Sequence, residues 1–275
     1  MKNVVKAMLS LALAVVLTLG NTAFALDGVR TEPIEPDYTE IVDEIFPGYD
    51  SQISPQWSSG DKDVANPGTH GFITQNAYEL LRDDQLAAYT FYSGQRTNLI
   101  RGSILPDVDE TDGVYAWHFY GSNGKNWSGG SITAYTKCIE HYNDAVDLYV
   151  AGAKSSAMEK LGRALHYLQD VNVPHHAMNK TAVFSNHSQF EAYVENNVSS
   201  FELTGLVASI YTDADYSLGT IIDDYAEIAR DWYDDASSDR TWNTAARSCV
   251  RNAQRATATV LYKFMYDVGF IADVR

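Results

Sequence analysis

Apolar residues recur at intervals of three and four along most of the chain after residue 56, the spacing that places side chains on one face of an α-helix. The pattern is clearest in 73–81, 139–149 and 246–265, and the last of these predicts a long final helix. Strand patterns are scarce, and no repeat recurs at a fixed period. We therefore expect a single all-α domain, a helical bundle, over residues 57–275.

Two segments interrupt the helical pattern. Residues 99–117 are expected to form the main irregular connection, because Pro106 and Gly113 are helix breakers. Residues 121–130 are rich in glycine, asparagine and serine, which predicts a loop.

The N-terminus has the pattern of a secretory signal peptide. Two lysines precede an apolar run over 7–19, and a small-residue cleavage site ends at Ala25. We expect residues 1–25 to be removed and the protein to be secreted. The alternative, a buried N-terminal helix, has no polar face to support it. No later apolar run reaches the roughly 18 residues needed to cross a bilayer, so we expect no transmembrane segment.

Residues 26–56 form a second unusual segment. They contain four prolines, eight acidic residues and one basic residue, a composition that predicts a solvated leader with little fixed structure.

The whole chain has 36 acidic against 20 basic residues and a net charge of -16, so we expect no nucleic-acid partner bound through a basic surface. The hydrophobic fraction of 45% and the charged fraction of 20% are typical of a folded globular protein.

The chain has two cysteines, Cys138 and Cys249. Export would permit a disulfide between them, and two free buried thiols are the alternative. Neither cysteine belongs to a C-x-x-C pair, so a thiolate metal site is not expected.

The strongest chemical signal is a group of histidines and acids between residues 166 and 191. His166 and Asp170 are four residues apart, and so are His187 and Glu191. On a helix this spacing brings the Cβ atoms within about 5 to 6 Å of each other on one face, close enough for both side chains to bind one ion. Each pair is therefore a candidate metal site.

A proline follows the first pair. Pro174 should end that helix and turn His175 and His176 back toward its end. Imidazole and carboxylate ligands without cysteine suit zinc, and open coordination positions suit a catalytic ion. The alternative is a hydrogen-bonded polar cluster in the core of a helical bundle.

The segment LHYLQDVNVPHHA over 165–177 resembles the signature of the bacterial zinc-dependent phospholipases C, the family of the secreted Bacillus enzyme and of the N-terminal domain of clostridial alpha-toxin. That family binds zinc through nine ligands, beginning with the N-terminal tryptophan of the mature protein. The residues of this chain that match them, in order, are Trp57, His70, Asp107, His118, His166, Asp170, His176, His187 and Glu191. The resemblance covers 57–275 and implies the all-α bundle of the phospholipase C and single-strand nuclease type.

By analogy with the family, three zinc ions are expected, with Asp170 shared between two of them. The three ligand sets are Asp107, His118, His166 and Asp170; Trp57, His70 and Asp170; and His176, His187 and Glu191. Asp107 is the residue expected to orient or deprotonate the attacking water, and attack by a bridging hydroxide without its help is the alternative. His141 and His175 match no ligand position; we expect His141 at the surface or in a core hydrogen bond, and His175 beside the ligands or exposed.

The tryptophan also explains the acidic leader. To bind zinc through a free α-amine, Trp57 must become the N-terminus of the mature protein. Residues 26–56 are therefore expected to be a propeptide that an activating protease removes after Gln56.

The resemblance implies a secreted, monomeric enzyme that hydrolyses glycerophospholipids, at a membrane or micelle surface, to diacylglycerol and a phosphorylated headgroup. The family's choline pocket uses an acid and two aromatic residues, and these positions read Gly60 (with Asp61 adjacent), Val108 and Tyr115. Val108 replaces one of the two aromatic residues, so one cation-π contact to a quaternary ammonium group is lost. We therefore expect that headgroups other than choline are possible. Because the chain ends at residue 275, we expect no C-terminal β-sandwich like that of alpha-toxin.

Two other functions stay open. The related single-strand nucleases share the fold and the N-terminal tryptophan, but they tend to end their ligand series with an aspartate and to have a longer gap before the last histidine. Here Glu191 is last, and His187 comes only 11 positions after His176. The second of these functions is a non-catalytic secreted binding module that zinc stabilises. A bridging carboxylate argues against that module, because structural zinc sites are usually closed and often cysteine-rich.

Overall fold

Helices make up the regular structure of the computed structural model, which describes residues 64–84, 86–205 and 207–272. Within those residues there is no strand, so the all-α prediction is confirmed. The predicted signal peptide (1–25), the predicted propeptide (26–56) and Trp57 lie outside the described residues.

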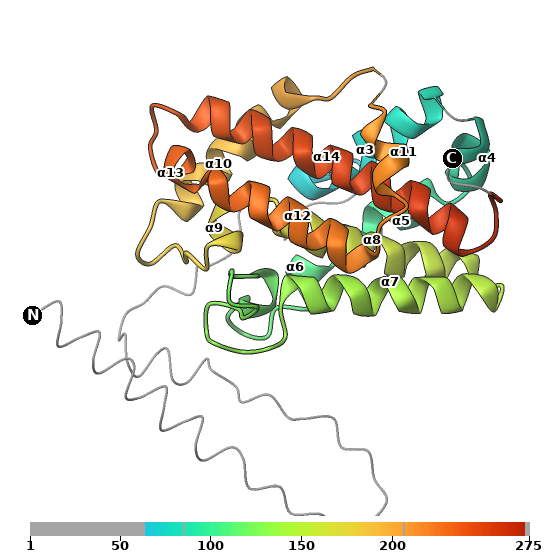
Figure 1. The fold of residues 1–275 in the computed structure, drawn as a ribbon, viewed down its shortest axis with the longest axis horizontal. Helices are drawn as coiled ribbons and strands as arrows, with labels where there is room; N and C mark the ends of the chain where they lie inside the picture. The colour runs from blue at the N-terminus through green and yellow to red at the C-terminus, as the bar shows by residue number, and fades with distance from the viewer. Residues whose placement is uncertain (1–63, 85, 206, 273–275) are drawn as a thin grey trace, which may run out of the picture. The chain divides into compact units, whose positions relative to one another are not determined.

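The elements are shown in Figure 1 and follow one another in this order: α3 (Gly68–Asp84), α4 (Leu86–Tyr92), α5 (Arg96–Gly102), α6 (Pro106–Asp109), η1 (Ala116–His118), α7 (Ala134–Val150), α8 (Lys154–Asp170), α9 (Pro174–Ala177), α10 (His187–Asn197), η2 (Val198–Phe201), α11 (Ser209–Asp213), α12 (Leu218–Asp231), α13 (Tyr233–Ala236) and α14 (Trp242–Asp267).

Three predicted helices are present as α3, α7 and α14. The prediction for 99–117 is partly wrong, because α5, α6 and η1 place short helical turns inside that segment. Pro106 does not break a helix there; it occupies the first turn of α6, where its fixed φ favours a helix and its missing N–H is not needed. The loop over 121–130 is confirmed and is organised by Asn126, whose Oδ1 accepts hydrogen bonds from the backbone N–H groups of Ser128 and Gly130.

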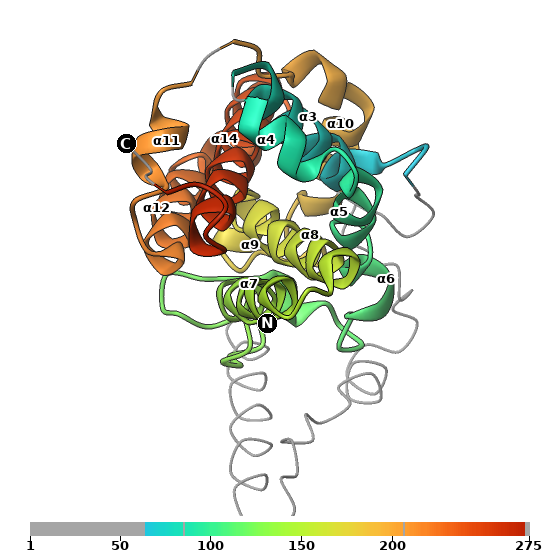
Figure 2. The same ribbon diagram turned by 90° about the vertical axis from the view of Figure 1, so that its right-hand side faces the viewer.

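α8 is the central helix of the bundle. It packs along α7 and α5 and also contacts α3 and α14 (Figure 2). Nine of the ten residues over 161–170 are buried, and Arg163 is the exception. The C-terminal half of α8 is therefore surrounded by other helices, and any polar side chain on it must find its partners inside the protein.

Two glycines allow α5 and α8 to cross in close contact. A Cβ atom on Gly102 would lie 2.1 Å from the carbonyl oxygen of Glu159, and one on Gly162 would lie 2.3 Å from the carbonyl oxygen of Leu99. Neither position can accept a side chain without moving a helix backbone. This contact sets the segment after Gly102 against the buried half of α8.

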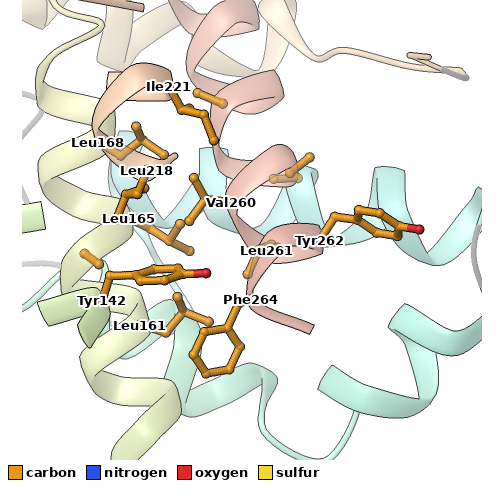
Figure 3. Close-up of a cluster of buried hydrophobic side chains, with 14 of the residues drawn as sticks. Tyr142, Leu161, Leu165, Leu168, Leu218, Ile221, Val260, Leu261, Tyr262 and Phe264 are labelled. Atoms are coloured by element: carbon orange, nitrogen blue, oxygen red, sulfur yellow. The ribbon is translucent and has the colours of Figure 1, made fainter. Parts of the chain in front are cut away.

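The main apolar core holds α7, α8, α12 and α14 together (Figure 3). Its members in that view include Tyr142, Leu161, Leu165, Leu168, Ile221, Val260 and Phe264. A second cluster joins α3, α10, α13 and α14 through Ile73, Phe190, Ala236 and Val250 among others. Burial of each large apolar side chain contributes about 1.5 to 3 kcal/mol. The first cluster packs against α8, and the second begins just beyond it at Val173.

The two cysteines lie on different helices, Cys138 on α7 and Cys249 on α14, and both are free and buried. Burial raises the pKa of each thiol. The alternative of two free buried thiols is thus the one observed. None of the described helices is long and apolar enough to span a membrane.

A partly buried charge network fastens α6 to α7 and α8. Glu110, at the end of α6, accepts hydrogen bonds from His141 Nε2 at 2.9 Å and from the Tyr167 hydroxyl at 3.2 Å, and it pairs with Lys137 Nζ at 3.1 Å. Arg163 contacts Glu110 and also donates two hydrogen bonds of 2.7 Å to Asp109. His141 is thus in a core hydrogen bond, one of the two environments expected for it.

Replacing Glu110 with glutamine should destabilise the protein in a pH-dependent way. Burial opposes ionisation, but His141 and Lys137 hold the pKa of Glu110 well below its usual range. The stabilisation is fully present above about pH 4.3, the ordinary pKa of glutamate, and is lost as the pH falls toward the lowered pKa of the folded protein. At pH 7 we expect Glu110→Gln to lower the free energy of unfolding by about 3 kcal/mol.

Urea denaturation of the parent and Glu110→Gln, with chelator present throughout, measures this difference. The difference in free energy of unfolding between the parent and the variant should be smaller at pH 3 than at pH 7. A gap of the same size at both pH values would contradict the assigned role of the Glu110 carboxylate.

Candidate metal centre

Eight of the nine predicted ligand residues meet in one buried region, and the ninth, Trp57, lies outside the described residues. The eight come from five helices and one 3-10 turn: His70 from α3, Asp107 from α6, His118 from η1, His166 and Asp170 from α8, His176 from α9, and His187 and Glu191 from α10. All eight are buried; Asp107 is the most exposed, at 5%.

The structure arranges these residues in three groups whose ligand atoms lie within 4.8 Å of one another. The groups are Asp107, His118 and His166; His70, His166 and Asp170; and His176, His187 and Glu191. The last group is the same as the third predicted ligand set. The other two share His166, because His166 lies between His70 and Asp107. That each of these residues ligates zinc stays a prediction.

The Asp170 carboxylate lies at the centre of four imidazole rings. Its Oδ2 is 2.8 Å from His118 Nδ1 and 3.2 Å from His166 Nε2. Its Oδ1 is 3.3 Å from His176 Nδ1 and 3.7 Å from His70 Nε2. Burial disfavours the charged carboxylate, but the charges of His166 and His118 hold the pKa of Asp170 well below its usual range.

The local sequence explains this convergence. α8 ends at Asp170, and Pro174 begins α9 after a connection of three residues, so that the chain turns back within a short distance. The turn brings His176 to the same carboxylate that His166 reaches from one helical turn earlier. His187 begins α10, and the predicted pair with Glu191 forms there, with His187 Nε2 3.0 Å from Glu191 Oε1.

Hydrogen bonds behind two of the rings determine which nitrogen faces Asp170. His70 Nδ1 donates to Gln169 Oε1 at 2.8 Å, and His166 Nδ1 donates to the carbonyl oxygen of Ser103 at 3.0 Å. The Gln169 amide is held in turn, because it donates to Thr74 and Thr257. Both histidines therefore direct Nε2 toward the centre, the ring atom that would bind a metal in place of a proton.

Sequence analysis did not identify Gln169 or Ser103, because neither follows a ligand spacing. His175, expected beside the ligands or exposed, is buried. Its ring stacks on that of His187 with centroids 4.9 Å apart, and its Nε2 is 3.1 Å from Asn186 Oδ1. Burial and the neighbouring His187 lower the pKa of His175 to about 3, so it stays neutral beside that ring.

The donor set fits a cation. His166 Nε2 and His118 Nδ1 lie only 3.1 Å apart, and both face carboxylates. His118 Nε2 is buried and makes no hydrogen bond within the part of the chain that the structure describes. Although burial opposes it, Asp107 and Asp170 raise the pKa of His166 to about 9, so the cluster attracts positive charge at neutral pH. Imidazole and carboxylate donors at this density suit zinc.

Tyr115 lies at the edge of the centre in a strained backbone conformation. Its φ of 56° is in the left-handed region, which a residue with a large side chain rarely adopts. The turn is held by the Tyr115 N–H, which donates to the carbonyl oxygen of Thr111, and by Asp112, which accepts from the N–H of Ala116. The tyrosine ring lies 5.7 Å from that of His118, so the aromatic residue predicted for the headgroup pocket does border the ligands.

The sequence that forms this centre is similar to those of known proteins. A family model described as zinc dependent phospholipase C matches residues 69–259. A phospholipase C from Clostridium haemolyticum is 28% identical over 259 residues, covering 82% of this chain and 63% of that protein. A phospholipase C from Bacillus cereus is 28% identical over 166 residues, covering 55% of this chain and 58% of that protein.

The fold is similar to that of a solved clostridial protein. The structure of alpha toxin from Clostridium absonum superposes with a TM-score of 0.68 at 26% identity, covering 73% of this chain and 64% of that chain. The chain thus spans less than two thirds of the length of these relatives. Because the family model extends from the helix that carries His70 to the middle of α14, the match includes every described ligand candidate, and the chain belongs to the zinc-dependent phospholipase C family.

Proposed function

We propose that this chain is a secreted trizinc phospholipase C that hydrolyses glycerophospholipids to diacylglycerol and a phosphorylated headgroup. The observation that carries the proposal is the Asp170 carboxylate, within 3.7 Å of four imidazole nitrogens from four different elements. Such a shared carboxylate suits ions held side by side, which can stabilise the attacking and leaving oxygens when a phosphodiester is cleaved. The N-terminal signal pattern supports secretion.

The proposed ligand sets are those implied by the family. Asp107, His118, His166 and Asp170 would hold one ion, His176, His187 and Glu191 a second, and His70 and Asp170 a third together with Trp57. When bound, zinc supplies a water of lowered pKa and neutralises charge on the phosphodiester oxygens. The protein groups around the substrate then orient the reacting atoms and move protons.

Asp107 is the residue we assign to the attacking water. Its Oδ1 lies 3.4 Å from His166 Nε2 and 3.7 Å from His118 Nδ1, and it is the ligand candidate most open to solvent. A carboxylate in this position can orient a water and accept its proton as the water attacks phosphorus.

The surroundings of the centre support a lipid substrate. Val108, next to Asp107, is 52% exposed, and Phe184, three residues before His187, is 76% exposed. These apolar side chains flank the ligand residues in sequence and are free to contact an apolar surface. Tyr115 remains as one aromatic wall for the headgroup, so we propose that a range of headgroups is accepted.

Metal content tests the assigned ligands. We expect Asp170→Asn to lower the zinc content by about two ions per chain and His187→Gln to lower it by about one, because Asp170 belongs to two ligand sets and His187 to one. Metal analysis of dialysed, folded protein measures this. Asp231→Asn, an exposed site on α12, is the matched control. Parent-like zinc content in Asp170→Asn would refute the shared-carboxylate assignment.

Hydrolysis assays test the activity. Protein beginning at Trp57 is given phosphatidylcholine, phosphatidylethanolamine or single-stranded DNA, with and without chelator. We expect chelator-sensitive release of diacylglycerol, and we expect Asp107→Asn to lower kcat by about 10² to 10⁴-fold, the usual cost of losing a general base. Asp231→Asn should behave as the parent.

The other functions have their own outcomes in the same assay. Cleavage of DNA alone would assign the chain to nuclease chemistry. Absence of cleavage with all three substrates, together with a higher melting temperature on zinc binding, would identify a zinc-stabilised binding module.

The propeptide is tested by N-terminal sequencing of the secreted, active protein. We expect the sequence to begin at Trp57, because only then is its α-amine free to bind zinc. Full activity in a protein that begins at Leu26 would rule out the propeptide assignment.

A further inference from the structure

A second polar site lies on the outer face of α14. It is a shallow cavity of about 260 Å³, lined by Trp232 from the end of α12 and by residues of the first half of α14. Three of the lining residues are arginines, namely Arg247, Arg251 and Arg255. Thr244, Ser248 and Asn252 supply the neutral polar groups, and no carboxylate lines the cavity.

The three arginines form a row because they are spaced by four residues along one helix. At 1.5 Å per residue the row extends for about 12 Å along α14. Among the described residues, none of the three has a carboxylate oxygen within 4.0 Å, although acidic residues outnumber basic ones by 36 to 20 in the chain. By contrast, Arg163 on α8 is paired with Asp109 and Glu110.

The contacts of the arginines leave much of their donor capacity unused. Arg251 Nη2 donates to the carbonyl oxygen of Glu202 at 3.3 Å, while its Nε is buried and makes no hydrogen bond to the described part of the chain. Arg255 Nη1 donates to Asn252 Oδ1 at 2.9 Å. A guanidinium carries five N–H donors, so most of them remain available to a ligand.

This cavity is separate from the metal centre. Thr257 lies on the side of α14 that supports the centre, because it accepts a hydrogen bond from Gln169, the partner of His70. At about 100° per residue, Ser248 projects about 180° away from Thr257. Figure 1 shows α14 and α12 side by side, and α12 supplies Trp232 at its C-terminal end.

The chemistry of the lining selects an anion. The three arginines have no carboxylate beside them in the cavity, so together they repel a cation. A ligand with a single carboxylate would neutralise only one of the three positive charges. A phosphate ester carries up to about two negative charges and several oxygens, and planar guanidinium groups bind such oxygens in pairs. We infer that the Arg247–Arg251–Arg255 cavity binds a phosphate-bearing anion, either a free phosphate ester or the headgroup of an anionic phospholipid.

The first test is a titration of the full zinc-loaded protein with inorganic phosphate at constant ionic strength, followed by tryptophan fluorescence. Trp232 lines the cavity, so Trp232→Phe should remove the signal that belongs to this site, as distinct from phosphate bound at zinc. We expect the double variant Arg247→Gln/Arg255→Gln to raise the Kd about tenfold or more, because each charge-assisted hydrogen bond contributes substantially. Arg251 is retained because it also supports the Glu202 segment.

The second test uses flotation with vesicles of phosphatidylcholine, with or without phosphatidylglycerol. Binding of the parent to the anionic vesicles, lost in the double variant, would identify a lipid headgroup as the source of the phosphate. An effect of the variant on phosphate alone would identify a free phosphate ester.

Controls separate this site from general charge effects. Arg240→Gln removes one exposed positive charge from outside the cavity and should bind as the parent does. Arg247→Glu alone, at an exposed position, is a second variant in case the double variant does not fold. Equal binding by parent and cavity variants in both assays, or equal weakening by Arg240→Gln, would overturn the inference.

Discussion

The buried carboxylate of Asp170 is the constraint on which the rest of the structure depends. A carboxylate removed from water costs several kcal/mol unless positive charge and hydrogen bonds surround it. Here that surrounding is four histidines, within 3.7 Å, from α3, η1, α8 and α9. The helix that carries Asp170 must therefore end inside the protein, and the chain must return to it at once, which Pro174 accomplishes.

The helices around α8 keep these histidines in place. The close crossing at Gly102 and Gly162 sets Ser103 behind His166, and the Glu110 network holds α6 against α7 and α8 immediately after Asp107. Gln169 fixes His70 and is itself fixed from α14 through Thr257. His70 and His166 are thus held by hydrogen bonds behind their rings, the kind of support that a catalytic metal site requires.

α14 links the two polar sites of the molecule. Its inner side joins both apolar cores and supports the metal centre through Thr257. Its outer side carries the three arginines, which face no carboxylate among the described residues. A long helix can serve both purposes because successive residues project at about 100° to each other, so different residues face different neighbours. The metal centre concentrates carboxylates and imidazoles, whereas the arginine cavity concentrates positive charge.

The sequence by itself determined the all-α class, the helices that became α3, α7 and α14, and the two histidine–acid pairs, because these follow from periodicity and from spacing within one helix. It also predicted, through family resemblance, that His70, Asp107 and His118 belong with those pairs. Only the tertiary structure decided that the cysteines are free and that 99–117 contains short helices. It also decided that Gln169 and Ser103 orient His70 and His166 and that Glu110 holds α6 against its neighbours. The orienting contacts join residues tens of positions apart, such as His70 and Gln169, which are separated by 99 positions in the sequence. Helical periodicity cannot encode such contacts, because it specifies only which residues share a face of the same helix.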